Sequence, residues 1–253
     1  MTAGETTVRR RMEAGEQLVG TFVQGHDTAA MEFLGGLGLD LLCVEAEHSA
    51  MGPETIRGLV AAAQVGGAPA LVRISGNDAT AIAGALDAGA QGIVVPRVDS
   101  AEEAAAAVAS TRYPPVGARG LGPGRAAAYG VDIPAYLERA NADLLLAVQV
   151  ETRAAVDGLD SLLEVDGVDM FFVGPGDLGC SLGIADPRDP ELISTIESIL
   201  SRTKAAGRMT GIFAGDPEAA KRWRAAGADL VILGSDFTWL GAGVKAALSA
   251  LHA

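Results

Sequence analysis

The chain has 253 residues, of which 49% are hydrophobic and 4% aromatic, and its formal net charge is −13 at pH 7. This length suits one (β/α)₈ domain, although it would also permit two smaller domains. The negative charge argues against a nucleic-acid or anionic-membrane partner, because few basic groups are present to neutralise rows of phosphates.

The sequence also gives no sign of membrane insertion or of export. No stretch approaches the ~18 apolar residues of a membrane span, and the amino-terminal residues contain no apolar signal region. Cys43 and Cys180 are the only cysteines and form no C-x-x-C pair or disulfide framework. We therefore expect a reduced, cytoplasmic setting.

Short apolar runs alternate with amphipathic stretches along the chain. Each run is almost continuous in hydrophobic residues, as expected for a parallel strand covered on both faces. Eight runs predict strands: Leu18–Gln24, Leu39–Glu47, Pro69–Ile74, Gly92–Val98, Leu144–Glu151, Val168–Pro175, Met209–Gly215 and Asp229–Asp236. Stretches with helical spacing lie between most of them, among them Pro53–Val65, Asp78–Ala88, Ala101–Ser110 and Pro217–Ala226.

Alternation of strand and helix, repeated eight times, indicates a parallel sheet. Together with the length it predicts the α/β class and one (β/α)₈ TIM barrel over residues 1–253. An open doubly wound sheet is the alternative, but no G-x-G-x-x-G follows the first predicted strand. Glycines recur between a helix and the next strand, as in AGAQGIVV and AGADLVIL, which is a helix-end signal.

One irregular stretch, residues 111–130, is rich in glycine and proline. Such a loop inside a compact domain is usually functional, and this composition alone places it near the site. A surface excursion or a subunit contact is the alternative.

Catalytic residues of these barrels come from the carboxyl ends of the strands and from the loops after them. The predicted strands end in polar groups: Glu45-Ala46-Glu47-His48, Arg73, Pro96-Arg97, Gln149-Val150-Glu151, Gly174-Pro175-Gly176-Asp177 and Gly234-Ser235-Asp236. The sequence thus predicts a ring of acidic and basic residues at one rim of the barrel.

Glu151 and Asp177 follow neighbouring strands and form the natural metal pair. Two carboxylates, with waters and a chelating substrate, suit a hard divalent ion such as Mg²⁺ or Mn²⁺. Alternatively, each carboxylate caps the helix that follows it, as Asp177 could do well.

His48 and Arg73 are candidates for proton transfer and for charge stabilisation. A histidine beside carboxylates at a strand end can act as a base, or it can be an ordinary loop residue. Arg73 should point into the barrel mouth, since burying it unpaired would be costly. There it could hold a carboxylate or a developing enolate, or form a structural ion pair with Glu45 or Glu47.

The lysines are informative because of where they lie. Only Lys204, Lys221 and Lys245 occur, and all fall in predicted helices. A Schiff-base aldolase needs a lysine that projects into the barrel mouth. An aldolase of this sequence would therefore polarise its carbonyl with a metal ion.

Six ordered motifs resemble the HpcH/HpaI aldolase family. They are GLDLLCVEAEH, LVRI, LDAGAQGIVVP, TRYPPVGARG, QVET and GVDMFFVGPGDLGCSLG. The resemblance runs from Gly20 to about Leu240. The family comprises class II, metal-dependent pyruvate aldolases of the phosphoenolpyruvate/pyruvate barrel superfamily.

The resemblance implies a role for several residues. Glu151 and Asp177 match the ligands of a divalent ion, which can be Mg²⁺, Mn²⁺ or Co²⁺. Arg73 matches the arginine that contacts the pyruvyl oxygen. His48 matches the base, acting through a water, and Asp87 matches an aspartate paired with that histidine across a subunit boundary.

The resemblance extends to the pyruvate pocket and to the assembly. Gln149 and the backbone near Gly176 match the pocket, and Phe213 falls where a pocket-lining aliphatic residue is common. The implied reaction is reversible cleavage of a 4-hydroxy-2-oxo acid, of the 2-keto-3-deoxy sugar acid or 4-hydroxy-2-oxoheptanedioate type, to pyruvate and an aldehyde. The implied assembly is a homo-trimer or homo-hexamer. Oxaloacetate decarboxylation, citramalyl-type cleavage and an inactive binding homologue are the alternatives.

One departure from the family pattern concerns the approach to the base. Glu45 stands where aspartate is usual, and Ala46 where glycine is common. The extra methylene of Glu45 bears on the placement of His48 and on the acceptor-aldehyde pocket. Arg119 and Arg125 are predicted to grip an acidic or polyhydroxylated tail of the acceptor.

Overall fold

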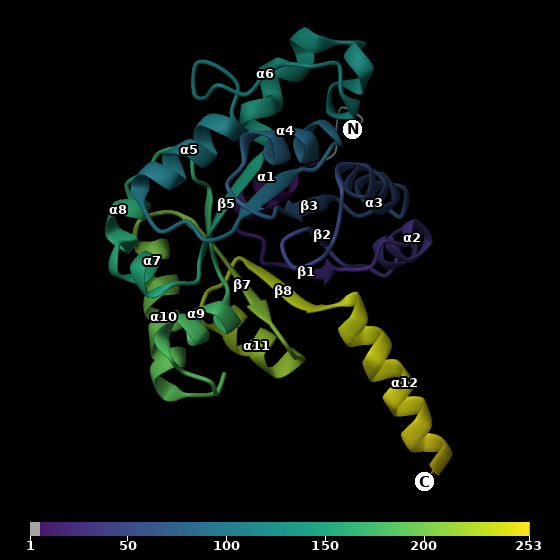
Figure 1. Ribbon diagram of the computed structural model, residues 1–253, viewed down its shortest axis with the longest axis vertical. Coiled ribbons are helices and arrows are strands. Elements are labelled where there is room, and N and C mark those ends of the chain that lie inside the picture. The colour runs from purple at the N-terminus through teal and green to yellow at the C-terminus, as the bar shows by residue number, and fades with distance from the viewer. Residues whose placement is uncertain (1–5, 253) are drawn as a thin grey trace.

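The computed structural model describes residues 6–252. Eight parallel strands pair in sequence order, and β8 pairs with β1, so the sheet closes into a barrel (Figure 1). The strands are β1 (Leu18–Val23), β2 (Leu41–Glu45), β3 (Ala70–Arg73), β4 (Gly92–Val95), β5 (Leu145–Val150), β6 (Met170–Val173), β7 (Met209–Ala214) and β8 (Leu230–Ser235). The predicted (β/α)₈ class is confirmed, and each predicted strand contains an observed one.

Helices follow the strands and surround the barrel (Figure 1). They are α1 (Val8–Glu13), α2 (Thr28–Gly35), α3 (Pro53–Val65), α4 (Ala79–Asp87), α5 (Ala101–Thr111), η1 (Arg125–Gly130), α6 (Ile133–Asp143), α7 (Arg153–Asp157), α8 (Leu159–Leu163), α9 (Pro175–Leu182), α10 (Pro190–Ala205), α11 (Pro217–Ala225) and α12 (Asp236–His252). Their starts are chemically defined. The side chains of Asp27, Asp78 and Ser100, for example, accept backbone N–H bonds at the first turns of α2, α4 and α5.

Side chains alternate between the inside and the outside of the barrel along each strand. On β2, Leu41 and Cys43 belong to the cluster inside the barrel, whereas Leu42 and Val44 pack outward in the cluster that includes the helices. The next inward position on β2 is Glu45. The alternation that builds the core therefore also aims the last residue of the strand at the barrel axis.

Helix α1 lies at the amino-terminal end of the barrel. Val8 and Met12 of α1 join the inner cluster, at 0% and 4% exposure. The Arg9 guanidinium donates to the carbonyl of Asn141 at 3.0 Å, and the backbone N–H of Val8 donates to Gln91, just before β4. These contacts place α1 and the end of α6 together at this end of the barrel.

The irregular stretch of residues 111–130 connects the end of α5 to η1 and then to α6. Because α5 runs back from the carboxyl end of β4, and α6 leads into the start of β5, this stretch lies at the amino-terminal end. Its predicted place near the site of its own chain is therefore wrong. Composition marked the loop as unusual but carried no information about which end of the barrel it occupies.

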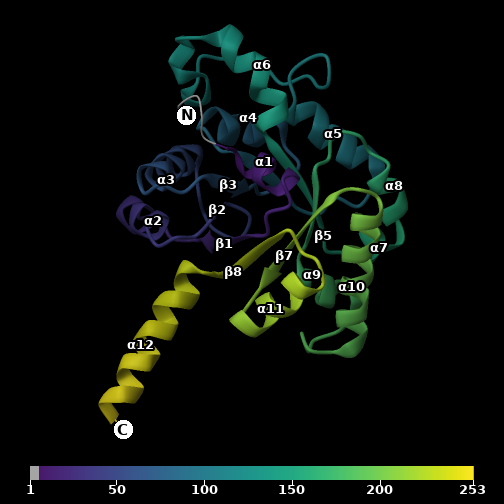
Figure 2. The ribbon, with the colours of Figure 1, turned by 180° about the vertical axis from the view of Figure 1, so that it is seen from behind.

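Helix α12 behaves unlike the other long helices. It projects away from the barrel in both views (Figures 1 and 2), and none of its residues is buried. Its contact with the barrel is near its start, where Trp239 donates an N–H bond to the Thr21 hydroxyl at 3.0 Å. Among the helices of residues 6–252, none is both long and apolar enough to cross a membrane.

Candidate active site at the carboxyl ends of the strands

Three polar side chains enter the barrel from the ends of neighbouring strands. Glu45 ends β2, and Arg73 ends β3 as its partner in the β2–β3 register. Gln149 follows the inward residues Leu145 and Ala147 on β5. Glu45 and Gln149 are 0% exposed and Arg73 is 8% exposed, so each needs partners inside the protein.

Arg73 forms the centre of this group. Its Nη2 pairs with Glu45 Oε2, its Nε lies 3.2 Å from Glu47 Oε2, and its Nη1 donates to Gln149 Oε1 at 3.4 Å. The guanidinium carbon lies 4.4 Å from the centre of the Phe22 ring, a cation–π distance. Burial alone would lower the pKa of Arg73, but the charges of Glu45 and Glu47 outweigh it and raise the pKa above its usual value.

Glu45 also fixes the loop that carries the candidate base. Its Oε1 accepts the backbone N–H of Glu47 at 2.8 Å and that of His48 at 3.1 Å, and the Ser49 hydroxyl donates to the Glu45 carbonyl. The carboxylate thus joins Arg73 to the loop. The longer glutamate side chain therefore reaches both Arg73 and the backbone of the loop, and His48 lies at the rim of the barrel.

The stability of the protein should depend on Glu45. Glu45→Ala leaves the buried guanidinium of Arg73 with Glu47 alone and removes the acceptor of two backbone N–H groups. We expect a loss of about 3 kcal/mol, at the lower end for a broken buried pair, measured as a fall in the urea midpoint. Glu13→Ala, which breaks an exposed pair with Arg9, should cost less than about 1 kcal/mol. Equal costs for the two variants would contradict this account.

His48 and Glu47 lie side by side at the rim. The His48 side chain is 54% exposed, and its Nε2 lies 3.7 Å from Glu47 Oε2. Burial raises the pKa of the Glu47 carboxyl, and the nearby charge of Arg73 opposes that rise. An accessible imidazole next to a carboxylate can exchange protons with a molecule in the barrel mouth.

Glu151 follows β5 and is 2% exposed. Its Oε1 accepts the backbone N–H of Arg97 at 2.8 Å, and its Oε2 accepts from the Gln149 amide. Arg97 holds this geometry with a φ of 53°, in the left-handed region that non-glycine residues rarely adopt. Such local strain is characteristic of functional sites.

Asp177 lies in the first turn of α9, and its side chain does not cap the helix, because Gly174 occupies the N-cap position without a side-chain bond. Burial raises the pKa of Glu151, hydrogen bonds from Gln149 and the Arg97 backbone oppose the rise, and the charge of Asp177 adds to it. The two carboxylates therefore lie close enough to repel each other.

This pair has the chemistry of a binding site for a hard divalent ion. The hydrogen-bond donors of Glu151 are neutral amides, which leaves its negative charge available to a cation placed between the two carboxylates. Residues 6–252 hold no cluster of three or more histidine, cysteine, aspartate or glutamate side chains suited to a metal ion. Two protein carboxylates would thus leave further coordination positions to waters and a substrate.

A cavity of about 230 Å³ opens between these groups. Its wall is made by Phe22, Gln24, Glu45, Arg73, Gly174, Pro175, Gly176, Asp177, Phe213 and Ser235. The Phe213 ring stacks on Phe22 with centroids 5.9 Å apart. The volume lies below the ~300–1,000 Å³ of typical ligand pockets and suits a small acid.

The defining sequence pattern of the HpcH/HpaI aldolase/citrate lyase family matches residues 18–241. The chain belongs to this family. Family membership confirms the resemblance drawn from the six motifs and, with the aldolases among the relatives, makes the protein a carbon–carbon lyase of the aldolase type.

Several known proteins are similar to this chain over nearly its whole length. The 4-hydroxy-2-oxo-heptane-1,7-dioate aldolase of Salmonella paratyphi B is 38% identical over 237 residues, which cover 93% of this chain and 90% of the relative. The crystal structure of an HpcH/HpaI aldolase/citrate lyase family protein from Burkholderia cenocepacia J2315 has a TM-score of 0.92 at 34% identity, covering 97% of this chain and 99% of the other. The citrate synthase SbnG has a TM-score of 0.89 at 28% identity and covers 98% of each chain.

The barrel of this HpcH/HpaI member brings together most of the predicted site residues. Seven of the eight lie at its carboxyl end: His48, Arg73, Gln149, Glu151, Gly176, Asp177 and Phe213. Phe22, Gln24 and Ser235 also line the cavity, and sequence reasoning assigned them no role. Inward alternation on β1 could have found Phe22, because Leu18 and Phe22 both belong to the inner cluster.

Asp87 is the predicted site residue that lies elsewhere in this chain. It ends α4, at the amino-terminal end of the barrel, where Arg119 Nη2 donates to its carboxylate at 2.6 Å. It cannot reach His48 of its own chain, so the prediction that it acts across a subunit boundary stays a prediction. Arg119 and Arg125 lie at this same end and do not line the active-site cavity of their own chain. Their predicted grip on an acceptor stays a prediction for a neighbouring subunit.

The three lysines lie on α10, α11 and α12, as predicted, and none of them lines the active-site cavity. Lys204 pairs with Asp229 at 2.6 Å, just before β8 and thus at the amino-terminal end. The carboxyl end of the barrel therefore offers no lysine side chain on which a Schiff base could form.

Proposed function

We propose that the protein is a metal-dependent aldolase that reversibly cleaves a 4-hydroxy-2-oxo acid to pyruvate and an aldehyde. The observation that carries the proposal is the buried Arg73 guanidinium, which faces a small cavity beside the carboxylates of Glu151 and Asp177. The Salmonella relative, a 4-hydroxy-2-oxo-heptane-1,7-dioate aldolase, supports the same substrate class. We infer an acid of the 2-keto-3-deoxy sugar acid or 4-hydroxy-2-oxoheptanedioate type.

In this proposal Glu151 and Asp177 hold the divalent ion, which is Mg²⁺, Mn²⁺ or Co²⁺. When bound, the ion supplies positive charge to the carboxylate and 2-keto oxygens of the substrate. Arg73 donates to the oxygen on which negative charge develops, from a position already fixed by Glu45 and Glu47. The rings of Phe22 and Phe213 exclude water from one wall of the cavity.

His48 acts as the base in the cleavage direction. It removes the proton of the C4 hydroxyl, through a water, and Asp87 of a neighbouring subunit supports the resulting imidazolium. The oxygen electrons form the aldehyde carbonyl, the C3–C4 bond breaks, and its electrons become those of the pyruvate enolate. A proton then adds to C3 and gives pyruvate. The reverse sequence forms the bond.

The substrate class can be tested by turnover. The purified protein is incubated with Mn²⁺ and either 4-hydroxy-2-oxoheptanedioate, a 2-keto-3-deoxy sugar acid, oxaloacetate or citramalyl-coenzyme A, and pyruvate is measured. We expect pyruvate and an equimolar aldehyde from a 4-hydroxy-2-oxo acid. Turnover of oxaloacetate alone would indicate a decarboxylase. Failure to exchange the methyl protons of pyruvate in D₂O would indicate a binding homologue without catalysis.

We also propose that the chain forms a homo-trimer or homo-hexamer. Asp87 can reach His48 only from another copy, which makes the assembly part of the mechanism. Helix α12 supports an assembly independently, because large apolar side chains recur on it at helical spacing: Phe237, Leu240, Val244, Leu248 and Leu251 are all at least half exposed. Such a stripe on a helix that buries nothing is typical of an interface.

The assembly can be tested through α12. Light scattering during gel filtration should give a mass of three or six 25.6 kDa chains. The double variant Val244→Asp, Leu248→Asp should give a smaller assembly, because two carboxylates would be desolvated in the interface. The matched variant Ala226→Asp, beyond the end of α11, should keep the wild-type mass. A monomeric wild-type protein would contradict both the assembly and the role of Asp87.

A further inference from the structure

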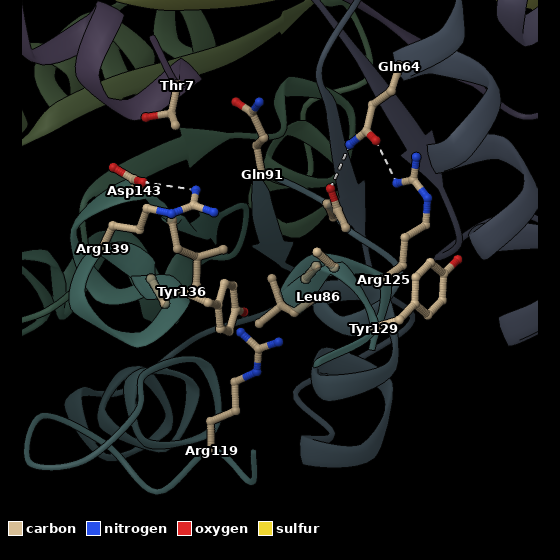
Figure 3. A pocket seen from close by; sticks show the side chains of 16 residues that line it. Thr7, Gln64, Leu86, Gln91, Arg119, Arg125, Tyr129, Tyr136, Arg139 and Asp143 are labelled. Carbon is tan, nitrogen blue, oxygen red and sulfur yellow. Dashed lines mark hydrogen bonds and ion pairs between the residues drawn. The ribbon is translucent and has the colours of Figure 1, made fainter. Parts of the chain in front are cut away.

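A second cavity, of about 330 Å³, lies at the amino-terminal end of the barrel (Figure 3). It shares no lining residue with the active-site cavity. Its wall comes from the ends of α3 and α4, from the turn before β4, and from η1 and α6. Its volume is in the range of sites that bind small organic molecules.

Three guanidinium groups surround this cavity. Arg119, Arg125 and Arg139 enter it from different sides (Figure 3). Arg119 pairs with Asp87 at 2.6 Å, and Arg139 lies 3.8 Å from Asp143, which also pairs with Arg10 at 2.8 Å. Positively charged groups therefore outnumber carboxylates around the cavity, although the net charge of the whole chain is −13. This local excess of positive charge favours an anionic ligand.

Arg125 contributes to this excess of positive charge. Its Nη1 donates to Gln64 Oε1 at 2.5 Å and to the Ala88 carbonyl at 3.3 Å, both of which are neutral acceptors. The same Gln64 amide donates to the Gly89 carbonyl at 2.9 Å, which fixes its orientation. Within residues 6–252, no carboxylate forms an ion pair with Arg125. Arg125 is thus held in place but not neutralised.

Gly89 makes room for this arrangement. Its φ is 100°, and a Cβ at this position would come within 2.7 Å of Arg125 Nη1. Ala128 and Tyr129 also line the cavity, and they adopt left-handed φ values of 47° and 55°. Non-glycine residues are strained in this region, and such residues cluster at ligand-binding segments.

Arg119 has an unmet hydrogen bond. Its side chain is 3% exposed, and its Nε is buried without a hydrogen-bond partner among the described residues. Its guanidinium points into the cavity (Figure 3). A buried charged donor left unpaired costs free energy that an acceptor on a ligand would recover.

Part of the wall is apolar. Leu86, Ala90, Ala140 and Leu144 line the cavity, together with the ring of Tyr136. Apolar walls with a few placed polar groups are typical of sites for organic ligands, whereas an inorganic anion would leave this surface uncovered.

We propose that this cavity is a binding site for an organic monocarboxylate with a compact apolar body. The carboxylate lies on Arg125 first, among the three guanidinium groups, because a planar guanidinium matches a carboxylate bidentately. The apolar body lies against Leu86, Leu144 and Tyr136. This site shares no lining residue with the catalytic cavity of the same chain.

The test uses benzoate, with benzyl alcohol as the uncharged match. Titration calorimetry on the full-length protein in its native assembly is run with saturating pyruvate and Mn²⁺, so that the catalytic site is occupied. We expect one benzoate per chain and no binding of benzyl alcohol. Arg125→Gln should weaken benzoate binding at least about tenfold, since a charge-assisted hydrogen bond is lost. Arg202→Gln on α10, which breaks an ion pair with Asp160 and does not touch the cavity, should leave benzoate binding unchanged.

A second variant tests the shape of the site. Ala140→Phe fills the cavity without altering its charge and should abolish benzoate binding. Both variants are checked for an unchanged thermal midpoint, and Arg125→Gln carries the test if Ala140→Phe fails to fold. Equal affinity of wild type and Arg125→Gln, or loss of benzoate binding when pyruvate is added, would overturn the proposal. The proposal would also be overturned if the wild-type protein did not bind benzoate and Arg125→Gln lowered the mass of the assembly. A second copy of the chain would then fill the cavity.

Discussion

Glu151→Gln is expected to lower kcat by about 1,000-fold while the barrel stays folded. The change removes one of the two carboxylates proposed to hold the divalent ion, and several kcal/mol of charge stabilisation are lost with it. Glutamine keeps the shape of the side chain and can still accept the backbone N–H of Arg97. Steady-state kinetics over a Mn²⁺ titration and calorimetric Mn²⁺ binding measure the effect, and EDTA should abolish the activity of the wild type.

A matched control separates metal binding from a general loss of negative charge. Asp157→Asn neutralises an exposed carboxylate on α7, close to Glu151 in the chain, and should leave kcat and Mn²⁺ affinity unchanged. Full turnover of Glu151→Gln, or of the EDTA-treated wild type, would remove the metal assignment. It would leave the fold and the Arg73 network untouched.

Arg73→Met should impair both activity and stability. We expect kcat to fall about 100- to 1,000-fold, because the donor to the developing negative charge is lost. The same change leaves the carboxylates of Glu45 and Glu47 buried without their cation, at a cost of about 3–5 kcal/mol. Kinetics with saturating metal ion and urea unfolding measure the two effects separately.

Arg73→Lys distinguishes the contribution of Arg73 to activity from its contribution to stability. It keeps the positive charge, so most of the stability should return, but an ammonium cannot reach Glu45, Glu47 and Gln149 together. We expect kcat to stay at least about tenfold below wild type. Arg57→Met, an exposed change on α3, serves as the matched control for stability. An Arg73→Met variant as active as Arg57→Met would contradict the role of Arg73.

The sequence predicts those parts of the molecule that local pattern determines. Eight apolar runs are enough to place the strands, and the polar residue at each strand end lies where barrel geometry requires. Arg73 illustrates this success, because an arginine that ends an apolar strand has few places to go other than the barrel mouth. The structural ion pair considered for it is formed with Glu45 and Glu47, and the same side chain also lines the cavity. Its catalytic role stays a prediction.

The remaining features depend on contacts between distant segments. Arg119 and Arg125 follow helix α5, which returns to the amino-terminal end of the barrel. No local signal in the sequence of a loop reveals at which end of the barrel the loop lies. The departure of α12 from the barrel is likewise absent from the pattern, because an amphipathic helix reads the same whether it packs on its own barrel or on another chain. The role of Asp87 was predicted only from the family motif. Within its own chain Asp87 pairs with Arg119 and does not contact His48.

The strict alternation on β2, β3 and β5 has a consequence for insertions and deletions. On each of these strands the inner face ends in a residue of the candidate active site, namely Glu45, Arg73 or Gln149, while the outer face packs against the helices. Because the side-chain period is two, adding or removing one residue within such a strand exchanges the two faces. A one-residue indel before Glu45 would thus remove the site and expose the core in a single step. Libraries that vary the length of this protein should place their indels in the loops, where the register of the strands is unaffected.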